Sequence, residues 1–250
     1  MSGPWAGLRG NRAVKFESVT RTHVGCRRKI NEDAVLSRPD LGIWAVADGM
    51  GGHDAGEVAS ALVVEVLSRV GVGRDLTART ARARLMLADA HAELVTLGER
   101  GPSQRTIGST VVVLLADAQA FTCLWAGDSR AYRARGGAIV QLTRDHSLVQ
   151  DLVEAGEIDP ADAASHPNAN IITRAVGANA ALVLDAVGEP VLAGDVFLLA
   201  SDGLTRLLSD DELLAGLQAP DLQAAADAFV ATCLERGAPD NVSFVMLRAG

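Results

Sequence analysis

Cysteine is scarce in this chain, and its few cysteines are not arranged in pairs. Cys26, Cys123 and Cys233 are the three cysteines among 250 residues, far apart and odd in number. This spacing argues against a disulfide scaffold and indicates reduced thiols, as in a cytoplasm. It also argues against zinc, because there is no Cys-x-x-Cys pair and the five histidines form no two-histidine helical motif.

Positive charge is also scarce. The chain has 23 Lys and Arg against 31 Asp and Glu, a formal net charge of −8, and Lys15 and Lys29 are its only lysines. Binding to a nucleic-acid backbone depends on concentrated positive charge. We therefore expect no nucleic-acid partner.

Long apolar runs are missing as well. Runs such as 111–116 are far shorter than the roughly 20 residues that a membrane helix needs. The first residues, Met-Ser-Gly-Pro-Trp, lack the charged-then-apolar layout of a signal peptide. We therefore expect a soluble, cytoplasmic protein without a membrane partner.

The chain does have enough apolar residues for a substantial core. Its 250 residues are 48% hydrophobic, which fits one domain over 13–250 behind a Gly-rich, flexible tail at 1–12. Short apolar runs broken by Gly and Asp predict a meander of strands over 107–142, and helical periodicity predicts a helix over 77–97. The residues of that helix expected to face the core are Leu85, Ala88, Ala92 and Val95. Strands grouped apart from helices indicate an α+β fold with an antiparallel sheet core.

The most informative stretch surrounds Asp48. An apolar run ends at this acid, three of the next four residues are glycine, and an amphipathic segment follows, which predicts a strand, a tight turn and a helix. Glycines let the backbone come close to whatever Asp48 binds, because no Cβ intervenes. By itself, however, an Asp-Gly pair after a strand is usually only a turn.

The same pattern of an acid at the edge of an apolar run recurs three times. Asp128 and Asp202 come just after such runs, and Asp240 comes just before one. If these strands share a core, their carboxylates converge with that of Asp48. Converging carboxylates repel one another unless cations lie between them, so the pattern predicts a metal centre.

Several short motifs follow one another in a recognisable order. They are Gly25…Arg28…Asn31-Glu32-Asp33, Asp48-Gly49-Met50-Gly51-Gly52-His53…Gly56-Glu57, Gly108-Ser109-Thr110, Gly127-Asp128-Ser129-Arg130, His166-Pro167…Thr173-Arg174-Ala175-Val176-Gly177, Ser201-Asp202-Gly203 and Asp240-Asn241. In this order, over residues 17–247, the chain resembles the PPM family of metal-dependent protein serine/threonine phosphatases (type 2C) in its compact bacterial form. The resemblance implies a four-layer α-β-β-α sandwich, in which two antiparallel sheets are flanked by helices.

The resemblance also implies two Mn²⁺ or Mg²⁺ ions and a third, weaker ion as in bacterial members. The implied ligands, direct or through bound water, are Asp33, Asp48, Gly49, Asp128, Asp202 and Asp240, with Glu32 as a further candidate. Asp48 would bridge the two main ions, and Asp128 with Asp202 would form the third site. Oxygen ligands of this kind favour Mg²⁺ or Mn²⁺ over zinc.

The remaining implied roles concern the substrate. Arg28 would hold the phosphate oxygens bidentately, which a guanidinium can do and an ammonium cannot. His53 is a candidate proton donor to the leaving group; the alternatives are that it stabilises the glycine turn and that a metal-bound water is the acid. Residues 145–170 correspond to the flap beside the active site, which we interpret as a mobile, substrate-selecting element, with a plain surface loop as the alternative.

The implied activity is hydrolysis of phosphoserine and phosphothreonine monoesters by a water activated between two metals. The expected partners are phosphorylated proteins and the bacterial Ser/Thr kinase that the enzyme counteracts, and we expect a monomer. One alternative is a pseudophosphatase that binds phosphoproteins without turnover. Such a protein is expected to have lost a metal-binding acid, and this chain has lost none. The other alternative is a two-metal nuclease or phosphodiesterase. Arg28 and the acidic composition argue against it.

Overall fold

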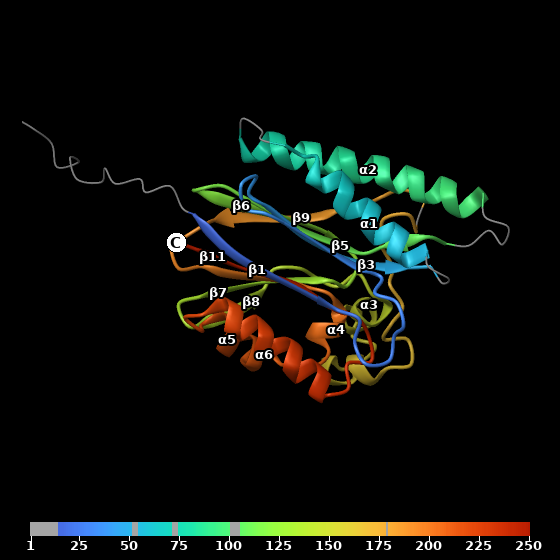
Figure 1. The fold of residues 1–250 in the computed structure, drawn as a ribbon. Coiled ribbons are helices and arrows are strands. Elements are labelled where there is room, and N and C mark those ends of the chain that lie inside the picture. Colours follow the sequence, from blue (N-terminus) through green and yellow to red (C-terminus); the bar gives the residue numbers. More distant parts are fainter. Residues whose placement is uncertain (1–14, 52–54, 72–74, 101–105, 179) are drawn as a thin grey trace, which may run out of the picture.

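Two antiparallel sheets form the centre of the protein (Figure 1). The computed structural model describes residues 15–51, 55–71, 75–100, 106–178 and 180–250, so the predicted tail lies outside the described residues. The first sheet has the order β1 (Phe16–His23), β11 (Val242–Ala249), β10 (Val196–Ala200), β7 (Arg130–Arg135) and β8 (Ala138–Gln141). The second has the order β2 (Asp33–Arg38), β3 (Ile43–Met50), β5 (Val111–Ala116), β6 (Ala120–Ala126) and β9 (Asp185–Pro190), with β4 (Gly108–Ser109) paired to β3.

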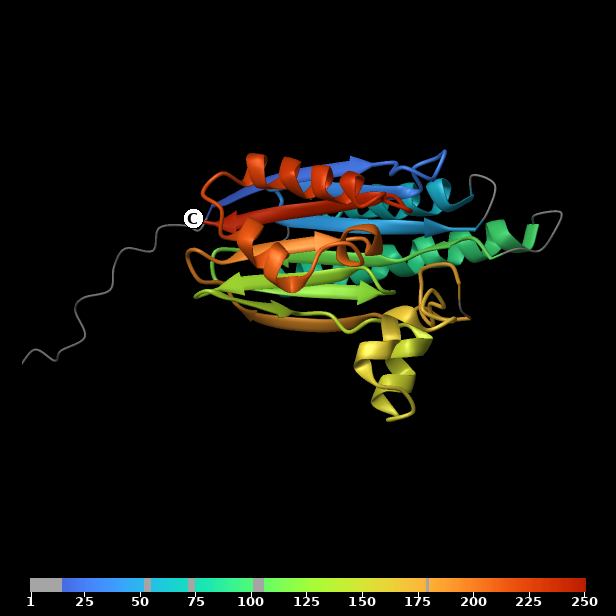
Figure 2. The ribbon, with the colours of Figure 1, turned by 90° about the horizontal axis from the view of Figure 1, so that it is seen from below.

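Helices cover the outer face of each sheet (Figure 1). The second sheet carries α1 (Ala55–Ser68) and α2 (Leu76–Arg100), and the first carries the one-turn helix α4 (Asp202–Thr205), α5 (Asp210–Leu217) and α6 (Leu222–Glu235). The predicted α+β, four-layer sandwich is therefore confirmed. A separate projection, formed by α3 (Leu148–Glu154) and the 3₁₀ helix η1 (Pro160–Ser165), extends from one end of the sandwich (Figure 2).

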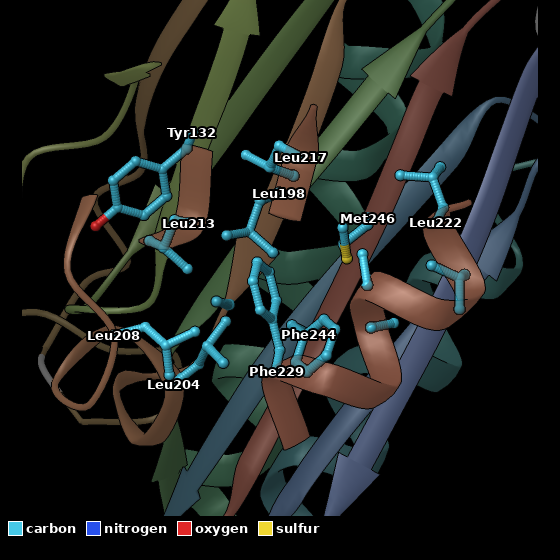
Figure 3. Packing of buried hydrophobic residues seen from close by; sticks show 14 of the residues in the cluster. Tyr132, Leu198, Leu204, Leu208, Leu213, Leu217, Leu222, Phe229, Phe244 and Met246 are labelled. Carbon is cyan, nitrogen blue, oxygen red and sulfur yellow. The ribbon is translucent and has the colours of Figure 1, made fainter. Parts of the chain in front are cut away.

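The central strands are apolar throughout because both of their faces are buried. In β5, Val112 and Leu114 point into the core between the sheets, whereas Val113 and Leu115 point toward α1 and α2. Strands buried on both faces show continuous apolar runs instead of alternation. Besides the core between the sheets and the core under α1 and α2, a third apolar core lies under α5 and α6. Figure 3 shows its side chains, which pack on those of β7, β10 and β11.

The inward face predicted for α2 is wrong. Leu85 is 67% exposed, and the buried apolar residues are Ala83, Leu87, Ala90 and Leu94. This helix carries two apolar stripes with helical spacing, so periodicity alone cannot choose between them. Two polar anchors on the buried stripe fix the choice: Arg79 donates to Gly42 O at 2.6 Å, and His91 Nδ1 accepts from Gly177 N at 2.9 Å.

None of the helices in the described part of the chain combines the length and the apolar content needed to cross a lipid bilayer.

Matched leucines on α2 test its packing. Leu87 is fully buried and Leu85 is mostly exposed. We expect Leu87→Ala to lower the free energy of unfolding by about 2–5 kcal/mol, because it leaves a cavity. Leu85→Ala should change it by less than about 0.5 kcal/mol. Urea unfolding measures both, and equal effects would contradict this orientation of the helix.

Candidate metal centre

Two acids of the second sheet lie directly opposite each other. Asp33 begins β2, Asp48 lies near the end of β3, and the two are cross-strand partners in the antiparallel register. Side chains of opposite residues share one face of a sheet, where two like charges destabilise the pair. The sheet therefore places two carboxylates together at one of its ends.

The first sheet brings its own acids to the same place. The end of β10 and the start of β11 are adjacent because these strands are antiparallel neighbours, which puts Asp202 near Asp240. Ser201 links the sheets: its Oγ donates to Asp33 Oδ2 at 2.9 Å and accepts from Ser243 N at 3.1 Å. The acids that follow and precede strands in different sheets thus form one cluster.

Backbone contacts hold the end of β3 in place. Asp48 N donates to Thr110 Oγ1 at 3.1 Å, and Thr110 N donates to Asp48 O at 2.8 Å. Thr110 Oγ1 also lies 2.7 Å from the hydroxyl of Ser129, the residue after Asp128. Glycine is required at position 49, because a Cβ there would lie 1.9 Å from the carbonyl oxygen of Gly56.

Asn241 is a supporting residue whose role the sequence analysis missed. Its Oδ1 accepts from Glu32 N at 2.8 Å, and its Nδ2 donates to Val24 O at 2.9 Å and Ile30 O at 3.1 Å. The side chain thereby ties the loop that carries Arg28 to the turn at Asp240. The Asp-Asn pair before an apolar run was the available signal.

Burial, and after it the charges of neighbouring acids, raise the pKa values of Asp33, Asp48 and Asp128. Burial raises the pKa of Asp48 well above its usual range, and the charges of Asp33, Asp202, Asp128 and Asp240 add to the effect. Burial also raises the pKa of Asp33 to about 7, with smaller contributions from Asp202 and Asp240. For Asp128, burial and then the charge of Asp202 raise the pKa to about 7. Such a cluster favours either protonation or a bound cation.

Two arginines neutralise part of this charge. Arg28 Nη2 donates to Asp240 Oδ2 at 2.7 Å, and Arg206 Nη2 lies 2.9 Å from Asp202 Oδ2 and 3.5 Å from Asp128 Oδ2. With the carboxylates held in this way, no three His, Cys, Asp or Glu side chains among the described residues are arranged to hold a metal ion.

The donor set nevertheless fits Mn²⁺ or Mg²⁺. It consists of oxygen atoms from carboxylates that repel one another, and hard divalent cations prefer such ligands. Asp128 Oδ1 is buried and has no hydrogen-bond partner among the described residues, so one oxygen is left for a cation.

The structure brings some of the predicted site residues together and leaves others outside the cluster. Asp33, Asp48, Asp128, Asp202 and Asp240 form the interacting cluster. Their individual roles as ligands stay predictions, as does that of the Gly49 carbonyl.

The other candidates lie around or outside this cluster. Glu32 accepts from Gly49 N at 3.0 Å through its backbone, and its side chain lies over Gly56, where an added Cβ would be 2.4 Å from Oε1. Arg28 is at the edge of the cluster, paired with Asp240. His53 lies outside the described residues.

The projection over 145–170 lies beside the cluster. A pocket of about 440 Å³ lies between this projection and α4. Its lining includes Asp128 and Asp202 and the apolar side chains of Val149, Val153 and Pro160. The predicted flap therefore contains α3 and η1 and borders the acids. Its substrate-selecting role stays a prediction.

The base of the flap is fixed by a polar network that the sequence analysis missed. Arg130 binds both carboxylate oxygens of Asp145. The ring of His146 is buried, and its Nδ1 accepts from Gly127 N at 3.2 Å, so the proton is on Nε2, which lies 3.1 Å from Asp185 Oδ2. Burial lowers the pKa of His146. A histidine within a polar run gave no distinctive sequence signal.

A family model described as "Protein phosphatase 2C" matches residues 26–241. The chain belongs to the protein phosphatase 2C family. Phosphatases of this family use metal ions, which agrees with the donor set of the cluster.

Named relatives support this assignment. The chain is 36% identical to "Serine/threonine protein phosphatase PstP" of Mycobacterium tuberculosis over 90% of this chain and 43% of that protein. It is 34% identical to "Serine/threonine phosphatase stp" of Listeria monocytogenes over 91% of this chain and 93% of that protein. The chain thus spans less than half of PstP and nearly all of stp.

Solved structures share the fold. The structure titled "PppA, a key regulatory component of T6SS in Pseudomonas aeruginosa" is 43% identical, with a TM-score of 0.88 over 96% of this chain and 100% of that one. The catalytic domain of PstP "in complex with 2 Manganese ions" is 33% identical, with a TM-score of 0.80 over 95% of this chain and 99% of that one.

The raised pKa values predict how the stability of this phosphatase-family chain depends on pH when chelator removes metals. The pKa of an unfolded Asp is about 3.9, whereas burial raises the pKa values of Asp33 and Asp128 to about 7 in the folded chain. The folded state therefore binds more protons, and this stabilisation is present below pH ~4 and lost as the pH rises through ~7. We expect the melting temperature in EDTA to fall over this range, and Asp33→Asn or Asp128→Asn to reduce the fall.

The exposed acid Asp89 on α2 provides the control, because Asp89→Asn should leave the dependence of the melting temperature on pH unchanged. Saturating Mn²⁺ should make this dependence weaker, since a bound cation replaces the protons that relieve the repulsion between the carboxylates. A flat profile in EDTA would contradict the electrostatic description of the cluster.

Proposed function

We propose that this chain is a Mn²⁺- or Mg²⁺-dependent phosphatase that hydrolyses phosphoserine and phosphothreonine monoesters in proteins, through one phosphatase domain over 13–250. The observation that carries the proposal is the cluster of mutually repelling carboxylates with the Arg28 guanidinium at its edge. Membership of the protein phosphatase 2C family supports the same activity.

The carboxylates of Asp33, Asp48, Asp202 and Asp240 and the carbonyl of Gly49 would hold two ions. Two bound ions supply a nucleophilic water and neutralise charge on the phosphoryl group. The chain's own contribution is to hold these oxygens at strand ends, where two sheets restrict their movement. The relative with two manganese ions supports this assignment, and either Mn²⁺ or Mg²⁺ fits the oxygen ligands.

Arg28 is proposed to bind the phosphate oxygens. Its side chain is 49% exposed, and one of its N–H groups binds Asp240 at 2.7 Å. A guanidinium has five N–H donors, so further donors can reach two phosphate oxygens at once. Asn241 fixes the loop that presents Arg28, which limits the entropy lost when phosphate binds. His53 stays the candidate proton donor, with a metal-bound water as the alternative.

The substrate and setting are part of the proposal. We propose a monomeric cytoplasmic enzyme that counteracts a bacterial Ser/Thr kinase; the three free cysteines suit a reducing compartment. The identity of 43% to PppA, titled a key regulatory component of T6SS, makes phosphoproteins of such a secretion system the first substrates to test.

Release of phosphate from a phosphothreonine peptide in Mn²⁺ tests the assignment. Asp48→Asn should lower kcat/KM by about a thousandfold or more, because it removes the proposed bridging ligand. Arg28→Ala should lower it by about 10–100-fold, because one charge-assisted contact to the phosphate is lost.

The neighbouring exposed arginine is the matched control, and Arg27→Ala should stay close to the unsubstituted chain. No turnover in any added metal, with phosphopeptide binding intact, would reject the phosphatase and favour the pseudophosphatase alternative.

A further inference from the structure

Arg206 contacts three parts of the protein at once. It follows α4, and its Nη2 lies 2.9 Å from Asp202 Oδ2 and 3.5 Å from Asp128 Oδ2. Its Nη1 donates a hydrogen bond to Asn170 Oδ1, at the end of the flap. The guanidinium therefore joins Asp128 and Asp202, the two acids at which the family resemblance implies a third cation, to the flap.

The environment of Asp128 shows that this charge is only partly balanced. Asp128 is 6% exposed, and its Oδ1 is buried without a hydrogen-bond partner among the described residues. Its Oδ2 is 3.5 Å from Arg206, longer than the 2.7–2.9 Å typical of a charge-assisted hydrogen bond. A divalent ion would satisfy this carboxylate better than the guanidinium does.

The flap is closed at its base and meets α4 near its end. Leu148 N donates to Ile171 O at 2.9 Å, and Ser147 pairs with Ile172, so the two chain segments that lead into and out of the flap are bonded together. Asn170 immediately precedes this closure. A hydrogen bond from Arg206 at this point restricts how far the flap can move from α4 and from the pocket between them.

We propose that Arg206 is a positioning residue that competes with the third cation and latches the flap. With the guanidinium between Asp128 and Asp202, Asn170 is held against α4. A divalent ion bound by the two carboxylates displaces the guanidinium, because the ion repels the positive charge that Arg206 places beside the same two acids, and the latch opens. Because the two events are thermodynamically linked, the closed latch weakens binding of the cation, and the bound cation disfavours the closed latch. This inference rests on the proposed function, and it adds to the two ions proposed there the third, weaker ion that the family resemblance implies at Asp128 and Asp202.

Mn²⁺ titration followed by calorimetry measures how strongly Arg206 competes with the cation, as the affinity of the weakest Mn²⁺ site. We expect Arg206→Ala to tighten the weakest Mn²⁺ site by about tenfold, because a competing positive charge is removed. Arg206→Gln keeps a hydrogen-bonding side chain without the charge and should tighten the site as well. Arg236→Ala is the matched control, since Arg236 pairs with Glu212 away from the cluster, and its affinities should not change.

Hydrogen exchange of residues 147–171 measures how often the flap opens. In the unsubstituted chain, exchange of the flap should accelerate by about tenfold as the weakest site fills. In Arg206→Ala and in Asn170→Ala, exchange should already be fast without metal, and in the former it should no longer respond to Mn²⁺.

Unchanged weak-site affinity and unchanged flap exchange in Arg206→Ala, with two tighter sites and phosphatase activity retained, would overturn this inference alone. Absence of Mn²⁺ binding in every variant would overturn the proposed function together with it.

Discussion

Mutual repulsion among carboxylates at one end of the sandwich is the constraint on which the rest of the structure depends. Asp33 and Asp48 face each other across two strands, and Asp202 and Asp240 lie just beyond the adjacent ends of β10 and β11 in the other sheet. A chain without a function for this arrangement would gain stability by replacing one of these acids. Stability given up at a functional site has to be supplied elsewhere, here by three apolar cores.

The layered fold makes this arrangement possible because it places the acids at strand ends or within two residues of them. Functional groups supported by strands are held more precisely than groups on loops. Short polar contacts fix each strand end: Thr110 holds Asp48, Ser201 holds Asp33, and Asn241 holds the loop of Arg28. The flap, in contrast, is attached at its base by backbone hydrogen bonds and near its end by the side chain of Asn170.

Part of the fold could be predicted from local patterns in the sequence: short apolar runs broken by Gly and Asp predicted strands and an α+β class. The four-layer sandwich was implied by the family resemblance that the ordered motifs carry. The buried face of α2 could not be predicted, because two apolar stripes compete and Arg79 and His91 decide between them through tertiary contacts. The pairing of Asp33 with Asp48 is likewise a property of strand register.

The roles of the supporting residues could be predicted only in small part. Asn241, His146 and Arg206 act through partners that are distant in sequence. The Asp-Asn pair before an apolar run was a signal for Asn241, but it did not identify these partners. Arg206 had one local hint, its position four residues after Asp202, which puts the two side chains on one face of a helical turn. Its second acid and its flap partner became visible only in three dimensions.

Anomalous X-ray scattering from crystals grown with Mn²⁺ shows whether this carboxylate cluster is a divalent metal centre. We expect manganese peaks among the oxygens of Asp33, Asp48, Asp202 and Asp240. Crystals that show no manganese there, with Asp240 still paired with Arg28 and Asp202 with Arg206, would contradict this expectation.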